Sequence, residues 1–185
     1  LDIALAYGVS LEANKKTDQA LKVYEKLLEQ NPNNTKIMER LAVAYMDQKD
    51  YKKAEALVKR ALELEPNNSD LNLLMANLLN EQEKNAEALP FVDKAIELNP
   101  RDYRGYFFKA IVLDKLGRII DAERNLREAI RLNPDDPELF NHLGYSLLLW
   151  YEDARLSEAE ELILKALSKD PENPAYIDSY AWVLY

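Results

Sequence analysis

The chain has 185 residues, of which 48% are hydrophobic and 31% charged, with a formal net charge of −9. This acidic excess argues against general affinity for nucleic acid or anionic lipid, because both carry negative charge. The absence of cysteine excludes disulfides, thiolate metal sites and cysteine nucleophiles. No apolar run approaches the roughly 20 residues that a bilayer-spanning helix needs.

Five prolines, each preceded by Asn, Glu or Asp, divide the chain at nearly equal intervals. The first four are 34 residues apart and the last step is 37. A fixed period of this length is typical of stacked repeats, in which several repeats together build an extended binding surface. The five are Pro32, Pro66, Pro100, Pro134 and Pro171. With each proline at position 32, we predict a single array with repeats 1–34, 35–68, 69–102, 103–136 and 137–171, followed by a partial sixth at 172–185.

Each repeat carries the pattern of two helices. The spacing of the larger residues, at positions 4, 7, 11 and 24, is helical rather than alternating. We therefore predict an all-α chain with helix A near positions 2–14 and helix B near positions 18–30 of each repeat. The proline after helix B ends it, and Pro90 falls inside the third helix B, where we expect a slight bend. Small residues stand at position 8 (Gly8, Ala42, Ala76, Ala110 and Gly144) and at position 20 (Ala20, Ala54, Ala88, Ala122 and Ala159).

These positions resemble the tetratricopeptide repeat (TPR), whose pattern is W-x2-L-G-x2-Y, then A-x3-F, then P. Five copies in register carry the resemblance, although position 4 never holds Trp. The resemblance implies a solenoid of antiparallel helix hairpins that forms a right-handed superhelix. It also implies that the A helices line a concave groove.

The chain lacks the residue patterns of an enzyme. His142 is its only histidine, so no pair of histidines can share a metal. No glycine-rich phosphate loop, nucleophile elbow or dinucleotide fingerprint is present in the sequence. We therefore expect no catalysis, no metal and no cofactor.

The TPR resemblance places positions 2, 5, 6, 9, 12 and 13 of helix A in the groove. In repeats three to five these positions form an apolar band flanked by mostly acidic charge, which favours binding of a protein or peptide segment. We therefore predict a non-catalytic interaction scaffold or adaptor. For Leu73 and Phe107, packing between neighbouring helices explains the residue equally well. The predicted partner-binding residues are Arg40, Leu73, Leu74, Asn77, Phe107, Phe108, Ile111, Tyr145, Leu148, Trp150 and Trp182.

Lys36 and Arg40 match two members of the carboxylate clamp by which some TPR chaperone co-factors hold a peptide C-terminus. The preceding repeat lacks the other members, so the sequence does not predict a full clamp. Two alternatives remain for this basic pair. It can hold a single acidic side chain of a ligand, or Glu39 and Asp47 can already neutralise it.

Repeat five has three extra residues between Leu147 and Ala159. This insertion either lengthens helix A or forms a protruding loop, and Trp150 either contacts a partner or packs on the neighbouring repeat. The apolar stretch ending at Tyr185 predicts that the native chain continues or that a partner copy covers this end. The alternative function is therefore a self-assembling scaffold that oligomerises through its apolar ends and the insertion.

The sequence from Asn141 onward, which begins N-x-L-G-Y-S-L, is similar to that of bacterial envelope TPR proteins. These include outer-membrane lipoproteins that act as adaptors for a carboxyl-terminal processing protease. The similarity implies an adaptor role, and a periplasmic or outer-membrane-associated location rather than the cytoplasm.

Overall fold

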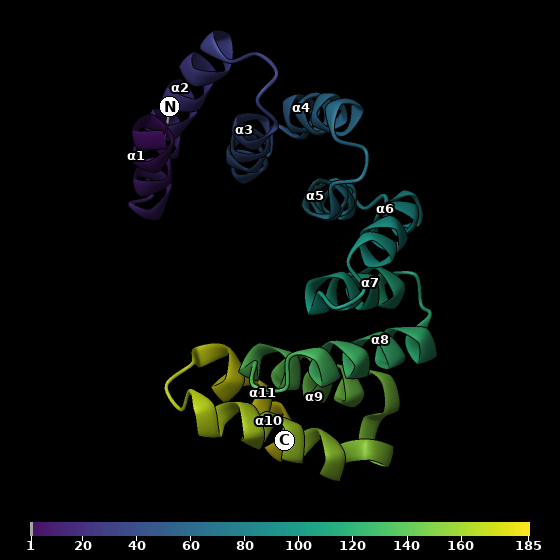
Figure 1. The fold of residues 1–185 in the computed structure, drawn as a ribbon. Coiled ribbons are helices and arrows are strands. Elements are labelled where there is room, and N and C mark those ends of the chain that lie inside the picture. Colours follow the sequence, from purple (N-terminus) through teal and green to yellow (C-terminus); the bar gives the residue numbers. More distant parts are fainter. Residues whose placement is uncertain (1) are drawn as a thin grey trace. The chain divides into compact units, whose positions relative to one another are not determined.

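The structure is a computed structural model that describes residues 2–185, apart from the side chain of Asp153. Within these residues it contains eleven α-helices, one 3-10 helix and no strand, which confirms the all-α prediction (Figure 1). The helices are α1 (Asp2–Ala13), α2 (Thr17–Gln30), α3 (Thr35–Asp47), α4 (Tyr51–Leu64), α5 (Ser69–Glu81), α6 (Asn85–Leu98), α7 (Tyr103–Lys115), α8 (Ile119–Leu132), α9 (Pro137–Tyr151), η1 (Glu152–Arg155), α10 (Leu156–Lys169) and α11 (Pro174–Leu184).

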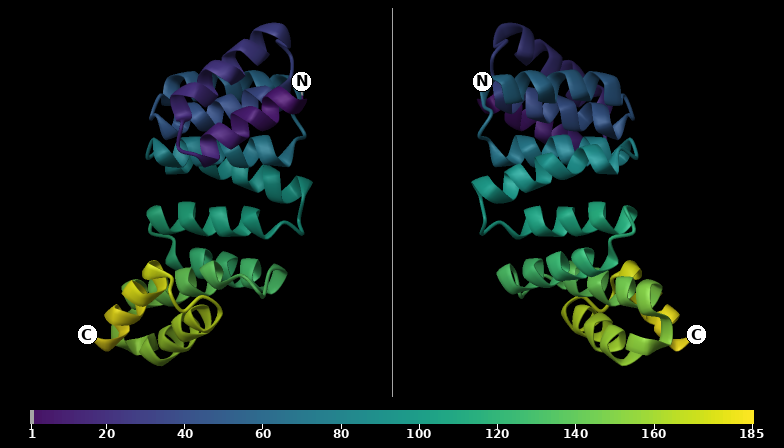
Figure 2. Two further views of the ribbon diagram at one scale, coloured as in Figure 1. Left: turned by 90° about the vertical axis from the view of Figure 1, so that its left-hand side faces the viewer. Right: turned by 90° about the vertical axis from the view of Figure 1, so that its right-hand side faces the viewer.

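The helices alternate between the two kinds that the period predicts. The odd-numbered helices are the A helices and the even-numbered ones are the B helices, and consecutive helices form hairpins (Figure 2). The contacts divide the chain into two compact units, which we describe separately. Unit 1 is Leu1–Asn99 and holds α1 to α6, while unit 2 is Pro100–Tyr185 and holds α7 to α11.

Small residues let the two helices of a hairpin approach closely. A Cβ on Gly144 of α9 would lie 2.9 Å from the carbonyl oxygen of Ala159 and 2.8 Å from Cγ1 of Ile163, both on α10. A Cβ on Gly8 of α1 would lie 2.3 Å from Cε1 of Tyr24 on α2. Protein interiors are densely packed and cannot absorb such overlaps without displacement. Position 8 therefore sets the separation of the two helices in these hairpins.

The residue two places after each proline starts the next A helix. The side chain of Asn34 accepts a hydrogen bond from the backbone N–H of Ile37 at 3.1 Å, and that of Asn68 accepts one from Leu71 at 3.2 Å. Such caps satisfy N–H groups that have no partner in the first helical turn. One short turn thus ends helix B at its proline and begins the next helix A. Asp102, Asp136 and Asn173 cap α7, α9 and α11 in the same way.

The insertion of repeat five takes a compact form. Helix α9 has 15 residues, whereas α3, α5 and α7 have 13 each. The 3-10 helix Glu152–Arg155 follows directly and leads into α10. The extra residues therefore lengthen helix A and add a tight turn.

Two further features concern single elements. Pro90 lies inside α6, which runs from Asn85 to Leu98, and its ring is exposed. None of the helices among residues 2–185 has both the length and the apolar character of a membrane span.

Candidate functional site

In unit 1 the A helices lie along one side and the B helices along the other (Figures 1 and 2). We call the surface of α1, α3 and α5 the A face of unit 1. Of the predicted binding residues, Arg40, Leu74 and Asn77 are half-buried there. Leu73 is only 8% exposed and belongs to the packed interior, as the packing alternative requires.

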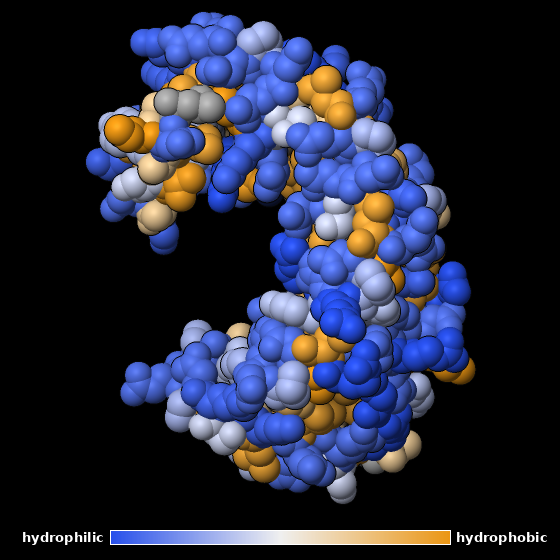
Figure 3. Space-filling model, viewed as in Figure 1, coloured by the Kyte–Doolittle hydropathy of each residue, from blue (hydrophilic) through white to orange (hydrophobic). Residues whose placement is uncertain are grey.

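The A face of unit 1 carries the whole acidic excess of that unit. The other residues of Leu1–Asn99 include 11 acidic and 11 basic side chains, so their formal charges cancel. Figure 3 shows hydrophobic residues over α1 and over other parts of the surface. On α1, Ile3 is 89% exposed. The charged residues of the three A helices are six acidic (Asp2, Glu12, Glu39, Asp47, Asp70 and Glu81) and two basic (Lys36 and Arg40).

The charges near the centre of this face are not paired with one another. Among the described residues, no ion pair or side-chain hydrogen bond involves Arg40, Lys36, Glu39 or Asp47. Glu39 and Asp47 therefore do not neutralise Lys36 and Arg40 by direct contact. The B helices and turns of unit 1 differ, because they carry closed ion pairs. These are Lys53–Asp50 at 3.0 Å, Lys59–Glu55 at 2.6 Å and Lys94–Glu97 at 3.1 Å.

Glu12 and Tyr24 meet at the junction of α1 with α2. Tyr24 is fully buried, and its hydroxyl has no hydrogen-bond partner of good geometry within the described chain; the same is true of Glu12 Oε1. Burial raises the pKa of the Tyr24 hydroxyl, and the negative charge of Glu12 raises it further. Burial also raises the pKa of Glu12; Tyr24 and Arg40 oppose this change, and Asp47 adds to it. Glu12 and Tyr24 thus interact with each other at poor hydrogen-bond geometry, and neither of these two oxygens has another hydrogen-bond partner within the described chain.

Glu39, on the same helix as Arg40, is in a similar position. Burial raises the pKa of the Glu39 carboxyl, and the negative charge of Asp70 reinforces the effect, while Arg40 and Lys36 oppose it. Arg40 therefore lies in the field of two acidic pairs, Glu12 with Asp47 and Glu39 with Asp70. The like charges in each pair repel one another, which raises the free energy of the face when no ligand is bound.

In unit 2 the corresponding surface, on α7, α9 and α11, combines apolar side chains with charged ones such as Asp114 and Lys115. Phe107 packs edge-to-face on His142, with ring centroids 5.0 Å apart, and it contacts the core cluster that includes Ala110 and Leu143. Leu148 packs on the same cluster. Burial lowers the pKa of His142, against the opposing charge of Asp114. Three predicted residues on these helices are half-buried without being placed in that cluster, namely Phe108, Ile111 and Tyr145.

Trp150 of the insertion is held by the neighbouring repeat. Its indole N–H donates a hydrogen bond to Asp114 Oδ1 at 2.6 Å, and its ring packs against Tyr151 and the core cluster. These contacts are those of the packing alternative. Trp182 on α11, in contrast, is 62% exposed.

Glu123 of α8 links the insertion to the preceding repeat through hydrogen bonds. Its carboxylate accepts hydrogen bonds from Arg155 at 2.8 Å, from Arg127 at 2.8 Å and from the Tyr151 hydroxyl at 2.9 Å. Although burial opposes the effect, these donors lower the pKa of Glu123. Arg155 also contacts Glu158 at the start of α10. The insertion therefore has a structural role, which its sequence alone did not reveal.

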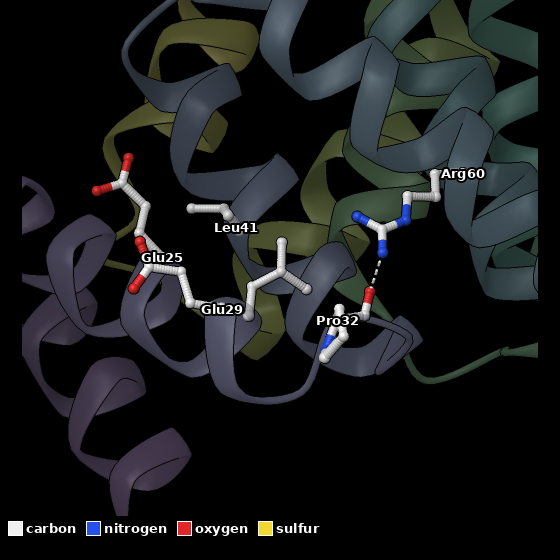
Figure 4. Close-up of a pocket in the computed structure, with 6 residues that line it drawn as sticks. Glu25, Glu29, Pro32, Leu41 and Arg60 are labelled. Carbon is white, nitrogen blue, oxygen red and sulfur yellow. Dashed lines mark hydrogen bonds between the residues drawn. The ribbon is translucent and has the colours of Figure 1, made fainter.

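A hollow of about 580 Å³ lies on the other side of unit 1, among α2, α3 and α4 (Figure 4). Two of its charged side chains, Arg60 and Glu25, are already engaged. Arg60 donates to the carbonyl oxygen of Pro32 and, at 3.3 Å, to Asn33 Oδ1, while Glu25 accepts a hydrogen bond from Tyr45 at 2.5 Å. This hollow offers fewer free groups than the A face. It is lined by Glu25, Leu28, Glu29, Pro32, Leu41 and Arg60.

Sequence reasoning did not select Glu12, Tyr24 or Glu39 as site residues. The count of acidic residues on the A helices was available from the sequence, but the absence of partners was not. That absence depends on distances between helices of different repeats. Within the described chain, the A face included, no group of three or more His, Asp or Glu side chains could hold a metal ion.

Three protein-family models, each described as "Tetratricopeptide repeat", match residues 11–78, 69–102 and 109–174. Among solved structures, a thermophilic TPR protein of Thermus thermophilus is 24% identical, with a TM-score of 0.84, and the match covers 99% of this chain and 98% of that one. PilW, a type IV pilus biogenesis factor, is 20% identical, with a TM-score of 0.85 and coverages of 99% and 88%.

YrrB, a TPR protein with an unusual peptide-binding site, is 21% identical, with a TM-score of 0.67 and coverages of 96% and 90%. None of the curated protein sequences matches this chain. At these identities the structural likeness concerns the fold alone. The family models and the structures agree on a helical repeat over most of the chain.

The charge of Glu39 should lower the stability of the folded protein. Because the folded protein raises its pKa above the ordinary 4.5, ionised Glu39 is destabilising at neutral pH. We predict that Glu39→Gln raises the Tm at pH 7 by roughly 1–3 °C, measured by circular dichroism. The gain should shrink as the pH falls through the folded-state pKa, and it should vanish below the unfolded-state pKa, where wild-type Glu39 is protonated in both states.

Glu63→Gln is the matched control, because Glu63 is exposed on α4 of the same unit and the change in charge is the same. The Tm of Glu63→Gln should stay close to that of the wild type, both at pH 7 and below the unfolded-state pKa of the carboxyl. A Glu39→Gln protein that melts below the wild type at pH 7 would contradict the account of this face.

Proposed function

The chain belongs to the tetratricopeptide-repeat family, and on this premise we propose that it is a non-catalytic interaction module that binds protein or peptide segments on its A faces. TPR proteins generally mediate protein–protein interaction, and one structural neighbour has a peptide-binding site. The observation that carries the proposal is the state of the A face of unit 1. Arg40, Glu39 and Asp47 form no ion pair among the described residues, and Glu12 and Glu39 are half-buried, so the face holds charge that a ligand can compensate.

The surface of α7, α9 and α11 in unit 2 supports the same function by a different chemistry. Phe108, Ile111 and Tyr145 are half-buried, so each keeps apolar area that a ligand can cover. Aromatic residues of this kind are frequent anchors at protein interfaces. We call this surface the A face of unit 2, and we propose that it receives apolar side chains of a partner.

Photo-cross-linking tests this function. With p-benzoylphenylalanine in place of Phe108, we expect a specific adduct in extracts of the source organism, which mass spectrometry identifies. The purified partner should then bind Phe108→Asp at least about tenfold more weakly than the wild type, because a carboxylate at an interface lacks a partner once desolvated.

Leu164 provides the matched control, since it is 43% exposed on α10 and lies outside the A face. The photoreactive residue at position 164 should give no such adduct, and Leu164→Asp should bind the partner normally. Adducts of equal yield at both positions, or undiminished binding by Phe108→Asp, would refute the A face as the binding surface.

Self-association is the second candidate function, and the exposed apolar residues of α11 favour it. Ile177, Trp182 and Leu184 are 51%, 62% and 69% exposed. Light scattering at increasing concentration should then show a mass that rises above that of one chain. A strictly monomeric chain at high concentration would exclude this function. Trp150 adds no support to it, because its side chain is packed within unit 2.

We further propose that the partner is a protein of the bacterial envelope, such as a carboxyl-terminal processing protease for which this chain serves as an adaptor. The support is the sequence from Asn141 onward, together with a structural neighbour that acts in type IV pilus biogenesis. The partner cross-linked at position 108 decides this point. A cytoplasmic protein as the main adduct would contradict it.

A further inference from the structure

We propose that the A face of unit 1 binds an extended peptide segment that carries two basic side chains. One is held by Glu12 with Asp47 and the other by Glu39, while Arg40 binds a backbone carbonyl between them. This inference rests on the proposed function and specifies the class of ligand.

Charge selects a basic ligand over an acidic one. The three A helices carry six acidic and two basic side chains, and the remainder of unit 1 is balanced. A positively charged segment is therefore attracted to this face in particular. An acidic segment would be repelled by the like charges of this face. Such repulsion lowers the affinity for a wrong partner and so contributes to specificity.

The site near Glu12 has unsatisfied groups that an ammonium would complete. Glu12 Oε1 is buried and has no hydrogen-bond partner of good geometry, and the same is true of the hydroxyl of the fully buried Tyr24. A lysine side chain has three N–H donors and no acceptor. One ammonium can therefore donate to both oxygens, and its positive charge offsets the repulsion between Glu12 and Asp47. Tyr24 is a hydrogen-bonding neighbour of Glu12, but a carboxylate can accept more bonds than one hydroxyl donates, so an ammonium would add donors to this site.

Arg40 explains why the ligand is extended. Its guanidinium forms no ion pair within the described chain and offers five N–H donors in a planar fork. In an extended segment, backbone carbonyls lie between successive side chains and remain free to accept such bonds. The charge of Arg40 acts on both the Glu12 and the Glu39 carboxyl, so Arg40 is near each of them.

The conformation of the ligand sets the spacing of its basic residues. Glu12 lies on α1 and Glu39 on α3, and α2 packs against both helices. In the extended polyproline II conformation three residues make one turn and rise about 9 Å. Basic residues at positions i and i+3 of such a segment therefore point to the same side, toward the A face.

The test uses three fluorescein-labelled peptides that differ at two positions, namely GAKLAKLAG, GAQLAQLAG and GAELAELAG. Fluorescence anisotropy measures their binding to the full chain at low and at near-physiological salt, since salt screens exposed charges more than buried ones. The lysine peptide should bind at least about tenfold more tightly than the glutamine peptide, and the glutamate peptide should bind most weakly.

Two double variants locate the site. Glu12→Gln with Glu39→Gln should weaken binding of the lysine peptide by about tenfold or more. Glu63→Gln with Glu87→Gln removes the same charge from exposed positions on α4 and α6, and should change binding less than about twofold. The first variant should fold at least as well as the wild type, because both substituted carboxyls have raised pKa values.

Several outcomes would overturn the inference. Equal losses in the two double variants would mean that only the net charge of the chain attracts the peptide. Tighter binding of the glutamine or glutamate peptide would refute a basic ligand while leaving a peptide-binding A face intact. If none of the three peptides binds, the basic-ligand inference fails, and the cross-linking at Phe108 still decides the proposed function separately.

Discussion

The close approach of helix A to helix B within each hairpin is the constraint on which the rest of this structure depends. At Gly144, a single added carbon would overlap the backbone of α10, and the alanines at position 20 are completely buried. Such contact uses the apolar sides of both helices. The opposite side of each helix A, with its charged residues, therefore points away from helix B of the same hairpin.

This constraint bears on how charge is arranged on α3 and α4 of unit 1. On the B helices, acidic and basic residues three or four positions apart close into ion pairs, as Lys59 and Glu55 do at 2.6 Å. On α3, Glu39 and Arg40 are adjacent in sequence and therefore point in different directions around the helix. Neither forms an ion pair or hydrogen bond within the described chain, and the half-burial of Glu39 makes its charge costly. In unit 2 the equivalent helices carry Phe108 and Tyr145, so that face offers apolar area beside its charges.

Periodicity predicted the helices closely, because turn chemistry and residue size are local properties. The proline at position 32 ends each helix B, and size at position 8 decides the hairpin contact. Burial at Leu73 and Trp150 was not predictable, because it depends on side chains some 30 residues away, such as Asp114 for Trp150. The unpaired state of Arg40 has the same origin. Opposite charges nearby in sequence suggested neutralisation, whereas only the positions of the helices show that no contact forms.

The central claim is that segments bind along the A helices and not along the B helices. Hydrogen–deuterium exchange of the full chain, with and without saturating GAKLAKLAG, tests it most directly by mass spectrometry. The account predicts slower exchange in the peptides covering α1 and α3, with α2 and α4 unchanged at their exposed ends. Slower exchange confined to α2 and α4, around the hollow lined by Glu25 and Arg60, would contradict it.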